Sequence, residues 1–256
     1  MRTVIIIPAF NEARSIGRVL GDLPAEQVGE VVVVNNASTD ETEANARVAG
    51  ATVLREDRQG YGYACLRGLA YVRELAAQGR TPEVVVFLDG DYSDHPDELP
   101  TLLAPIEQGL ADLVIGSRIL GRRHGRVEPG AMLPQALVGN RVACALIRLF
   151  WGVRFTDLGP FRAIRYPALL ALGMEDRTWG WTVEMQIKAA RAGLRCTEVP
   201  VSYRRRIGVS KITGTLSGTL KASWKILWTI ARFALTPRPS PGVLESPLDS
   251  SVRDVG

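Results

Sequence analysis

Two aspartates at the end of an apolar run are the residues of this chain best placed to do chemistry. Residues 84–88 are all apolar, and Asp89 and Asp91 follow them. Such a run is typical of a strand buried on both faces, and open α/β sheets bind ligands at the carboxyl ends of these strands. Side chains two residues apart in an extended segment point the same way. Two carboxylates placed like this suit Mg²⁺ or Mn²⁺ carrying a diphosphate, although Asp-Gly-Asp is also typical of a solvated turn.

Polar loops also follow the first two apolar runs of the chain. Residues 8–12 come after the run at 4–7, and residues 35–38 come after the run at 30–34. Three polar loops at one edge of a parallel sheet indicate a nucleotide site, because base, ribose and diphosphate all need polar partners there. Gly60-Tyr61-Gly62 lacks the third small residue of a dinucleotide-binding loop, so we expect a tight turn near the donor.

The order of the elements predicts an α/β fold with a doubly wound, mostly parallel sheet. We expect strands at 4–7, 30–34, 51–54, 84–88, 113–116 and 197–203. We expect helices at 11–23, 41–49, 63–78, 96–108, 138–151, 181–192 and 216–235. Ser38 or Thr39 could cap the second helix, and the Gly- and Arg-rich residues 121–134 indicate a mobile loop.

The bulk composition is that of an ordinary globular protein. Of 256 residues, 46% are hydrophobic and 23% charged, with a net charge of +4. Residues 199–244 contain no acid but eight basic residues, which favours phosphates or an anionic membrane as partners. Three scattered cysteines argue for a reducing compartment and against a zinc site. Nucleic acid is the least favoured binding partner, because the cationic residues lack interleaved exposed aromatic residues on strands.

Five motifs, taken in order, resemble the family 2 glycosyltransferases, which have the GT-A fold. The motifs are Pro8-Ala9-Phe10-Asn11-Glu12, Asn36-Ala37-Ser38-Thr39-Asp40, Asp89-Gly90-Asp91, Gly116-Ser117-Arg118 and Arg205-x-x-Gly208-x-Ser210-Lys211. The resemblance covers about residues 3–235. Within the family, the chain is most similar to the dolichol-phosphate mannosyltransferase and polyprenyl-phosphate glucosyltransferase branch.

The resemblance implies a role for each matching residue on the donor side. Pro8, Ala9 and Glu12 would line the nucleoside pocket, with Glu12 at the ribose hydroxyls, and Asn36 would lie near the base. Asp89 would face the ribose or the metal, and Asp91 would ligate the metal, Mg²⁺ or Mn²⁺. The family pattern often has Gln where this chain has Ser93, and Asp94 could supply the missing ligand. Asn35 stands where the family commonly has Asp, so the sequence leaves open whether the base of the donor is uracil or guanine.

The resemblance also implies roles on the acceptor side. Arg118 would sit near the sugar-phosphate, and Asp157 matches an acidic position beside the acceptor. Arg205 and Lys211 would neutralise the donor diphosphate or the acceptor phosphate from a loop that closes over the site, and Ser210 of the same loop would also bind substrate. For Asp157, a catalytic base and a loop or helix-cap aspartate are equally compatible with the sequence.

We expect one domain over residues 1–235 and a disordered Pro/Ser-rich tail at 236–256. Residues 1–118 would form the nucleotide-sugar half and residues 119–235 the acceptor half with its C-terminal helices. In helix 216–235, Lys221, Lys225 and Arg232 fall on one stripe beside apolar residues. This pattern favours an interfacial membrane helix, with packing on the core or in a homodimer as the alternatives.

These observations predict a metal-dependent, inverting glycosyltransferase. It would move a hexose from a UDP-sugar, or from GDP-mannose as the second choice, to a polyprenyl phosphate. It would be cytoplasmic and peripheral on the inner face of the cell membrane. One alternative is a soluble hydroxyl acceptor with Asp157 as the general base. The other is a nucleotide-binding module without turnover.

Overall fold

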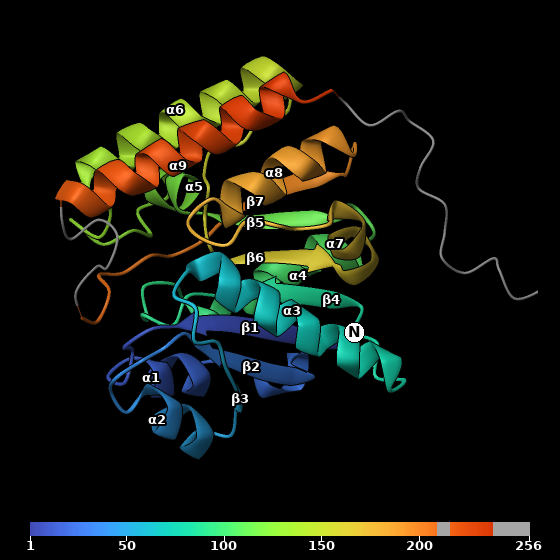
Figure 1. The fold of residues 1–256 in the computed structure, drawn as a ribbon, viewed down its shortest axis with the longest axis vertical. Coiled ribbons are helices and arrows are strands. Elements are labelled where there is room, and N and C mark those ends of the chain that lie inside the picture. The colour runs from blue at the N-terminus through green and yellow to red at the C-terminus, as the bar shows by residue number, and fades with distance from the viewer. Residues whose placement is uncertain (209–215, 238–256) are drawn as a thin grey trace, which may run out of the picture.

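A seven-stranded sheet forms the centre of the computed structural model, which describes residues 1–208 and 216–237 (Figure 1). The strands are β1 Thr3–Ala9, β2 Glu30–Asn35, β3 Thr52–Arg55, β4 Val84–Phe87, β5 Leu113–Ser117, β6 Arg162–Arg165 and β7 Cys196–Pro200. Their order is β3-β2-β1-β4-β6-β5-β7. Only β6 of these strands is antiparallel to its neighbours, β4 and β5. The predicted α/β fold with a mostly parallel sheet is confirmed.

Helices cover both faces of the sheet. They are α1 Ile16–Gly21, α2 Thr42–Val48, α3 Tyr61–Ala77, α4 Leu99–Glu107, α5 Arg118–Arg123, α6 Pro134–Trp151, α7 Tyr166–Leu172, α8 Trp181–Arg191 and α9 Leu216–Leu235, with 3₁₀ turns η1 Ala25–Gln27 and η2 Pro96–Glu98. One hydrophobic core contains residues of α1, α2 and α4, and the other contains residues of α3, α6, α7 and α8. In β1, Val4 and Ile6 enter one core and Ile5 and Ile7 the other, which is why the strand is apolar throughout.

The first predicted helix begins five residues later than expected. Residues 11–15 form a loop that is tied to the loop after β2, where the Asn11 amide donates to Ser38 Oγ and the Ala13 amide to Asp40 Oδ2. The predicted Ser38 or Thr39 cap is wrong as well. Asp40 Oδ1 accepts the Thr42 amide at the start of α2 instead.

The structure also contains elements that the sequence did not predict. Strand β6 and helix α7 were missed, and α5 occupies the beginning of the predicted loop 121–134. The predicted strand 197–203 ends at Pro200. Helix α9 has the predicted bounds.

Helix α9 packs beside α6 in an outer layer, with α8 beneath it (Figure 1). Its predicted basic stripe is turned partly toward the protein, because Lys225 Nζ lies 2.7 Å from Asp176 and Arg232 Nη2 lies 3.6 Å from Glu175. Trp224 is instead 70% exposed. Within the described residues, no helix has the length and apolar character needed to cross a bilayer.

Gly62 allows α3 to begin in contact with the chain before α8. The Gly62 amide donates to the Thr178 carbonyl at 3.1 Å, and a Cβ on Gly62 would lie 2.1 Å from the Asp176 carbonyl oxygen. Gly60 stands just before the helix at φ +152. The expected tight turn is therefore also a close packing point between two distant segments.

We predict that Gly62→Ala lowers the free energy of unfolding by about 1–3 kcal/mol, because the backbone must shift to admit the methyl group. Gly17→Ala is the matched control, since no atom lies within 4 Å of the added Cβ. It should be neutral or stabilising by up to about 1 kcal/mol. Urea unfolding of both variants measures the difference, and equal values would contradict the packing argument.

Candidate active site

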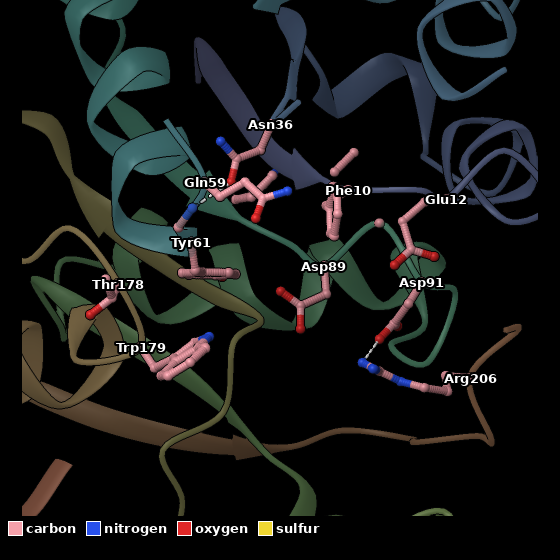
Figure 2. Close-up of a pocket in the computed structure, with 14 residues that line it drawn as sticks. Phe10, Glu12, Asn36, Gln59, Tyr61, Asp89, Asp91, Thr178, Trp179 and Arg206 are labelled. Carbon is pink, nitrogen blue, oxygen red and sulfur yellow. Dashed lines mark hydrogen bonds and ion pairs between the residues drawn. The ribbon is translucent and has the colours of Figure 1, made fainter. Parts of the chain in front are cut away.

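The loops after β1, β2 and β4 meet at a cavity of about 440 Å³ (Figure 2). The lining residues are Pro8, Ala9, Phe10, Glu12, Asn36, Gln59, Gly60, Tyr61, Asp89, Gly90, Asp91, Thr178, Trp179 and Arg206. All six donor-side residues that the motifs placed in one pocket are among them, together with the Gly60-Tyr61 turn. Buried parallel strands ending at one edge bring these distant residues together.

Each of the three loops holds one non-glycine residue in the left-handed region. These are Asn11 (φ 54), Ala37 (φ 60) and Tyr92 (φ 64), and no other described non-glycine residue has positive φ. Such conformations cost about 1–3 kcal/mol each and persist where surrounding contacts enforce them, often at functional sites. Asn11 illustrates this, because its Oδ1 accepts the Thr39 amide at 2.8 Å.

Asn36 shapes the wall of the cavity through its amide group. Its Nδ2 donates to the carbonyls of Glu56 and Arg58, and its Oδ1 accepts the Gly60 amide at 2.8 Å. The side chain thus fixes the loop before α3, which carries Gln59 and Tyr61 into the cavity. This is a positioning role beside the predicted base pocket.

Asp89 and Asp91 present carboxylate oxygens to the cavity. Asp91 is 3% exposed, its Oδ1 accepts the Ser93 amide at 2.8 Å, and its Oδ2 pairs with Arg206. Asp89 Oδ1 is buried without a hydrogen-bond partner, and burial raises the pKa of this carboxyl group. In Figure 2 the Asp89 carboxylate points into the cavity. A buried oxygen without a partner beside a second carboxylate fits a hard divalent cation.

Asp94 does not join this pair. It is 2% exposed, it lines neither this cavity nor the next, and both its carboxylate oxygens are buried without hydrogen bonds. Burial, and then the nearby Asp89 carboxylate, raise the pKa of Asp94 from 3.8 to about 8. Among the described residues, no three His, Cys, Asp or Glu side chains cluster as a metal site. Because Asp94 lines neither cavity, its assignment as the third ligand stays a prediction.

Arg206 is the charged residue of the cavity that the motifs missed, beside the uncharged Gln59, Thr178 and Trp179. The segment around it lies along the loop after β4, where the Ile207 amide donates to the Asp91 carbonyl at 3.0 Å and the Arg204 amide to the Ser93 carbonyl at 2.9 Å. Side chains alternate in an extended segment, so Arg204 and Arg206 can both face that loop. The signal in the sequence was the run of three arginines, of which the motif selected the middle one.

Arg205 lies elsewhere, against the loop before α6. The Arg205 guanidinium donates to the Pro129 carbonyl through Nε at 2.9 Å and lines a second cavity. Ser210 and Lys211 lie outside the described residues, as does the predicted tail from residue 238 onward.

The second cavity, of about 590 Å³, adjoins the first. Both are lined by Tyr61, Asp89, Trp179 and Arg206. The second cavity adds Arg118 and Arg205, with an apolar wall made of Ala131, Met132, Leu133, Ala136, Leu158 and Pro160. A cationic region with an apolar wall suits a ligand that combines an anionic head with a hydrocarbon chain.

Arg118 is held by a buried ion pair with Asp157. Its Nη2 lies 2.7 Å from Asp157 Oδ1, and its Nε and backbone amide both donate to Asp157 Oδ2 at 2.8 Å. Burial lowers the pKa of the Arg118 guanidinium, but Asp157 outweighs this effect and raises it. Asp157 is fully buried with both oxygens committed. This geometry argues against Asp157 as a general base, which must reach the proton of an acceptor.

The chain around Asp157 is fixed by side chains from three elements, β7, α8 and α6. Glu198 of β7 accepts the Thr156 and Asp157 amides, and Gln186 of α8 donates to the Asp157 carbonyl at 3.0 Å. Asn140 of α6 accepts the Leu158 amide at 2.8 Å. Asp157 therefore sits in a rigid network that holds Arg118 at the edge of the second cavity.

Comparison with known proteins agrees with this geometry. A family model described as glycosyl transferase family 2 matches residues 4–165. An uncharacterized glycosyltransferase of Mycobacterium tuberculosis is 37% identical over 228 residues, covering 87% of this chain and 96% of the relative. An undecaprenyl-phosphate mannosyltransferase of Micrococcus luteus is 34% identical, covering 85% of this chain and 90% of that protein.

A solved structure shows the same fold. Glucosyl-3-phosphoglycerate synthase of Mycobacterium tuberculosis, crystallised with Mn²⁺, UDP-glucose and phosphoglyceric acid, superposes with a TM-score of 0.71 and 22% identity. The match covers 92% of this chain and 80% of that one. The predicted GT-A fold is confirmed.

We predict that Asp157→Asn lowers the free energy of unfolding by about 3 kcal/mol, because it leaves the Arg118 charge without its counterion. The control is Asp97→Asn, which changes an exposed carboxylate and should alter stability by less than about 1 kcal/mol. Thermal and urea unfolding measure both. A variant with wild-type stability and no turnover would instead restore Asp157 as a catalytic base.

We predict that Asp94→Asn, measured in EDTA, stabilises the protein increasingly as the pH rises from about 4 to about 8. The folded wild type holds the Asp94 proton more tightly than the unfolded chain, because the folded pKa is about 8. Wild-type stability therefore falls across this window and no further above it. Melting temperatures of both proteins from pH 4 to pH 9 provide the test, and a constant difference would contradict it.

Proposed function

Because the chain belongs to glycosyl transferase family 2, we propose that it transfers a hexose from a nucleotide diphosphate sugar to a polyprenyl phosphate, with inversion at the anomeric carbon. A UDP-hexose is preferred over GDP-mannose as the donor. Inversion rests on the family resemblance. The acceptor assignment rests on the two adjoining cavities, one carrying carboxylates and the other arginines with an apolar wall.

The first cavity would hold the donor. Glu12 and Asn36, which both line it, would contact the nucleoside. Asp89 and Asp91 also line it, and Asp89 lines the second cavity as well. Asp89 and Asp91 would hold Mg²⁺ or Mn²⁺, which neutralises the diphosphate and favours its departure. The relative in the fold comparison was crystallised with Mn²⁺ and UDP-glucose, which supports this assignment.

The second cavity would hold the acceptor phosphate. Among the described residues that line it, three are arginines and only Asp89 is an acid. A phosphate monoester is already an anionic nucleophile and needs no general base. Because Asp157 is committed to Arg118, a phosphate acceptor fits the site better than a hydroxyl acceptor. The apolar wall would receive the first units of the lipid chain.

The reaction forms a bond between an acceptor phosphate oxygen and C1 of the sugar while the bond from C1 to the donor diphosphate breaks. Negative charge grows on the leaving diphosphate. Arg206 lines both cavities, so its guanidinium is placed to stabilise that charge where it develops. Arg118, fixed by Asp157, would orient the incoming phosphate.

A soluble phosphorylated acceptor is the second candidate. The solved relative is named for transfer to phosphoglycerate, and an arginine-lined cavity would bind that phosphate too. The apolar wall and the relative named for undecaprenyl phosphate favour the lipid. A lipid acceptor also implies peripheral attachment to the inner face of the cell membrane.

The proposal is tested by release of nucleoside diphosphate from a panel of UDP- and GDP-sugars with Mg²⁺ or Mn²⁺. We expect release to require one donor and a polyprenyl phosphate, and to stop in EDTA. Asp91→Asn should reduce turnover at least about 100-fold with the fold intact, because charge stabilisation by the metal is lost.

Asp97→Asn is the control and should retain wild-type turnover. Release with phosphoglycerate but not with the lipid would replace the lipid by a soluble acceptor. Tight donor binding without release under any condition would leave a nucleotide-binding module. Full turnover by Asp91→Asn would disprove the site assignment.

A further inference from the structure

A third cavity, of about 640 Å³, lies between α5 and α6. None of its described lining residues lines either of the other two cavities. Five arginines line it: Arg122, Arg123, Arg141, Arg148 and Arg154. The remaining lining residues are neutral, and they include the apolar side chains of Ile119, Leu137 and Phe155.

These five arginines, which we call the arginine groove, have no partner among the described residues. In the part of the chain that the structure describes, none of their side chains makes a hydrogen bond or an ion pair, and no acid lines the cavity. Arginines elsewhere are paired, as Arg118 is with Asp157 and Arg195 with Asp112. All five residues are exposed, and an exposed cluster of like charges without a nearby partner attracts anions.

The arginine groove borders an exposed apolar face. Arg141 and Arg148 lie on α6 and so do the exposed apolar residues Val138, Val142, Leu149 and Phe150, of which Leu149 is 73% exposed. Helix α9 runs beside α6 in Figure 1 and adds exposed Trp224, Leu227, Trp228 and Leu235. Tryptophan and aliphatic residues flanked by basic side chains are typical of a surface that lies in a membrane interface.

We propose that this face rests on an anionic phospholipid bilayer and that the arginine groove binds a phospholipid headgroup phosphate. The apolar residues of α6 and α9 would enter the acyl boundary, and the arginines beside them would remain at headgroup depth. The positive charge of the arginine groove favours an anionic bilayer over a second copy of the chain as the partner of this face. A symmetric dimer through this face would add a second set of unpaired arginines to the interface, without an acid to offset them.

The groove is separate from the acceptor cavity, so this inference does not rest on the proposed function. It does give that function an orientation, because Leu133, at the start of α6, lines the second cavity. A chain lying with α6 on the bilayer would present that cavity close to the lipid surface.

Co-sedimentation of the full chain with vesicles tests the proposal. We expect binding to phosphatidylcholine vesicles that contain phosphatidylglycerol and much weaker binding to phosphatidylcholine alone. Arg141→Ala/Arg148→Ala should weaken binding to the anionic vesicles about tenfold or more. The control Arg14→Ala/Arg18→Ala removes the same charge from exposed arginines near α1, at the opposite end of the molecule, and should bind as wild type does (Figure 1).

Several outcomes would overturn the proposal. An equal loss in both double variants would show attraction by net charge alone. Binding of inorganic phosphate without vesicle binding would show a site for a free anion. A dimer in sedimentation velocity that the groove variant dissociates would assign the face to a second copy. Release of nucleoside diphosphate with a short, water-soluble prenyl phosphate should be unchanged in the groove variant, which separates this inference from the proposed function.

Discussion

The buried ion pair between Arg118 and Asp157 is the interaction on which the second cavity, the proposed acceptor site, depends. Burying two charges is costly, and the net contribution of such a pair to stability is small unless every remaining donor and acceptor is satisfied. Here both carboxylate oxygens accept from Arg118, and the neighbouring backbone is bonded by Glu198 and Gln186. The main contribution of the pair is therefore to fix the position of the Arg118 side chain, and its net contribution to the stability of the fold is smaller. It joins the end of β5 to the loop before β6 and fixes a guanidinium at the cavity edge.

The antiparallel strand β6 explains how that loop reaches the site. A parallel strand brings its carboxyl end to the ligand-binding edge, so the residues that follow it line the site. An antiparallel strand between two parallel ones reverses this, and the residues that precede it arrive at the same edge. Asp157, Leu158 and Pro160 precede β6 and lie there for this reason. Arg162, the first residue of β6, is fully buried beneath the loop and donates to the Gly159 and Leu158 carbonyls.

The three loops that line the first cavity after β1, β2 and β4 could be predicted from the sequence because these strands are continuous apolar runs that end in polar residues. Pattern and topology together place Glu12, Asn36 and Asp89 at one edge without knowledge of any contact. Strand β6 could not be found in this way, because Arg162 and Arg165 at its ends give no apolar run, and the carbonyls that accept from Arg162 are visible only in three dimensions. The choice of Arg206 over Arg205 likewise depends on which side of an extended segment faces Asp91.

Net charge does not predict which surface of this chain attracts an anionic partner, because its arginines fall into two groups. Arg118, Arg162 and Arg206 pair with carboxylates or donate to carbonyls, so their charges are largely compensated within the protein. The arginines between α5 and α6 have no such match among the described residues, although the sequence gives both groups the same formal charge. Only the unmatched charges contribute fully to the field outside the molecule, and a field of a few exposed guanidinium groups reaches about one Debye length, roughly 8 Å, in physiological salt. The orientation of the protein at an anionic surface therefore depends on where its arginines lack partners. The fold, and not the number of charges, determines where that is.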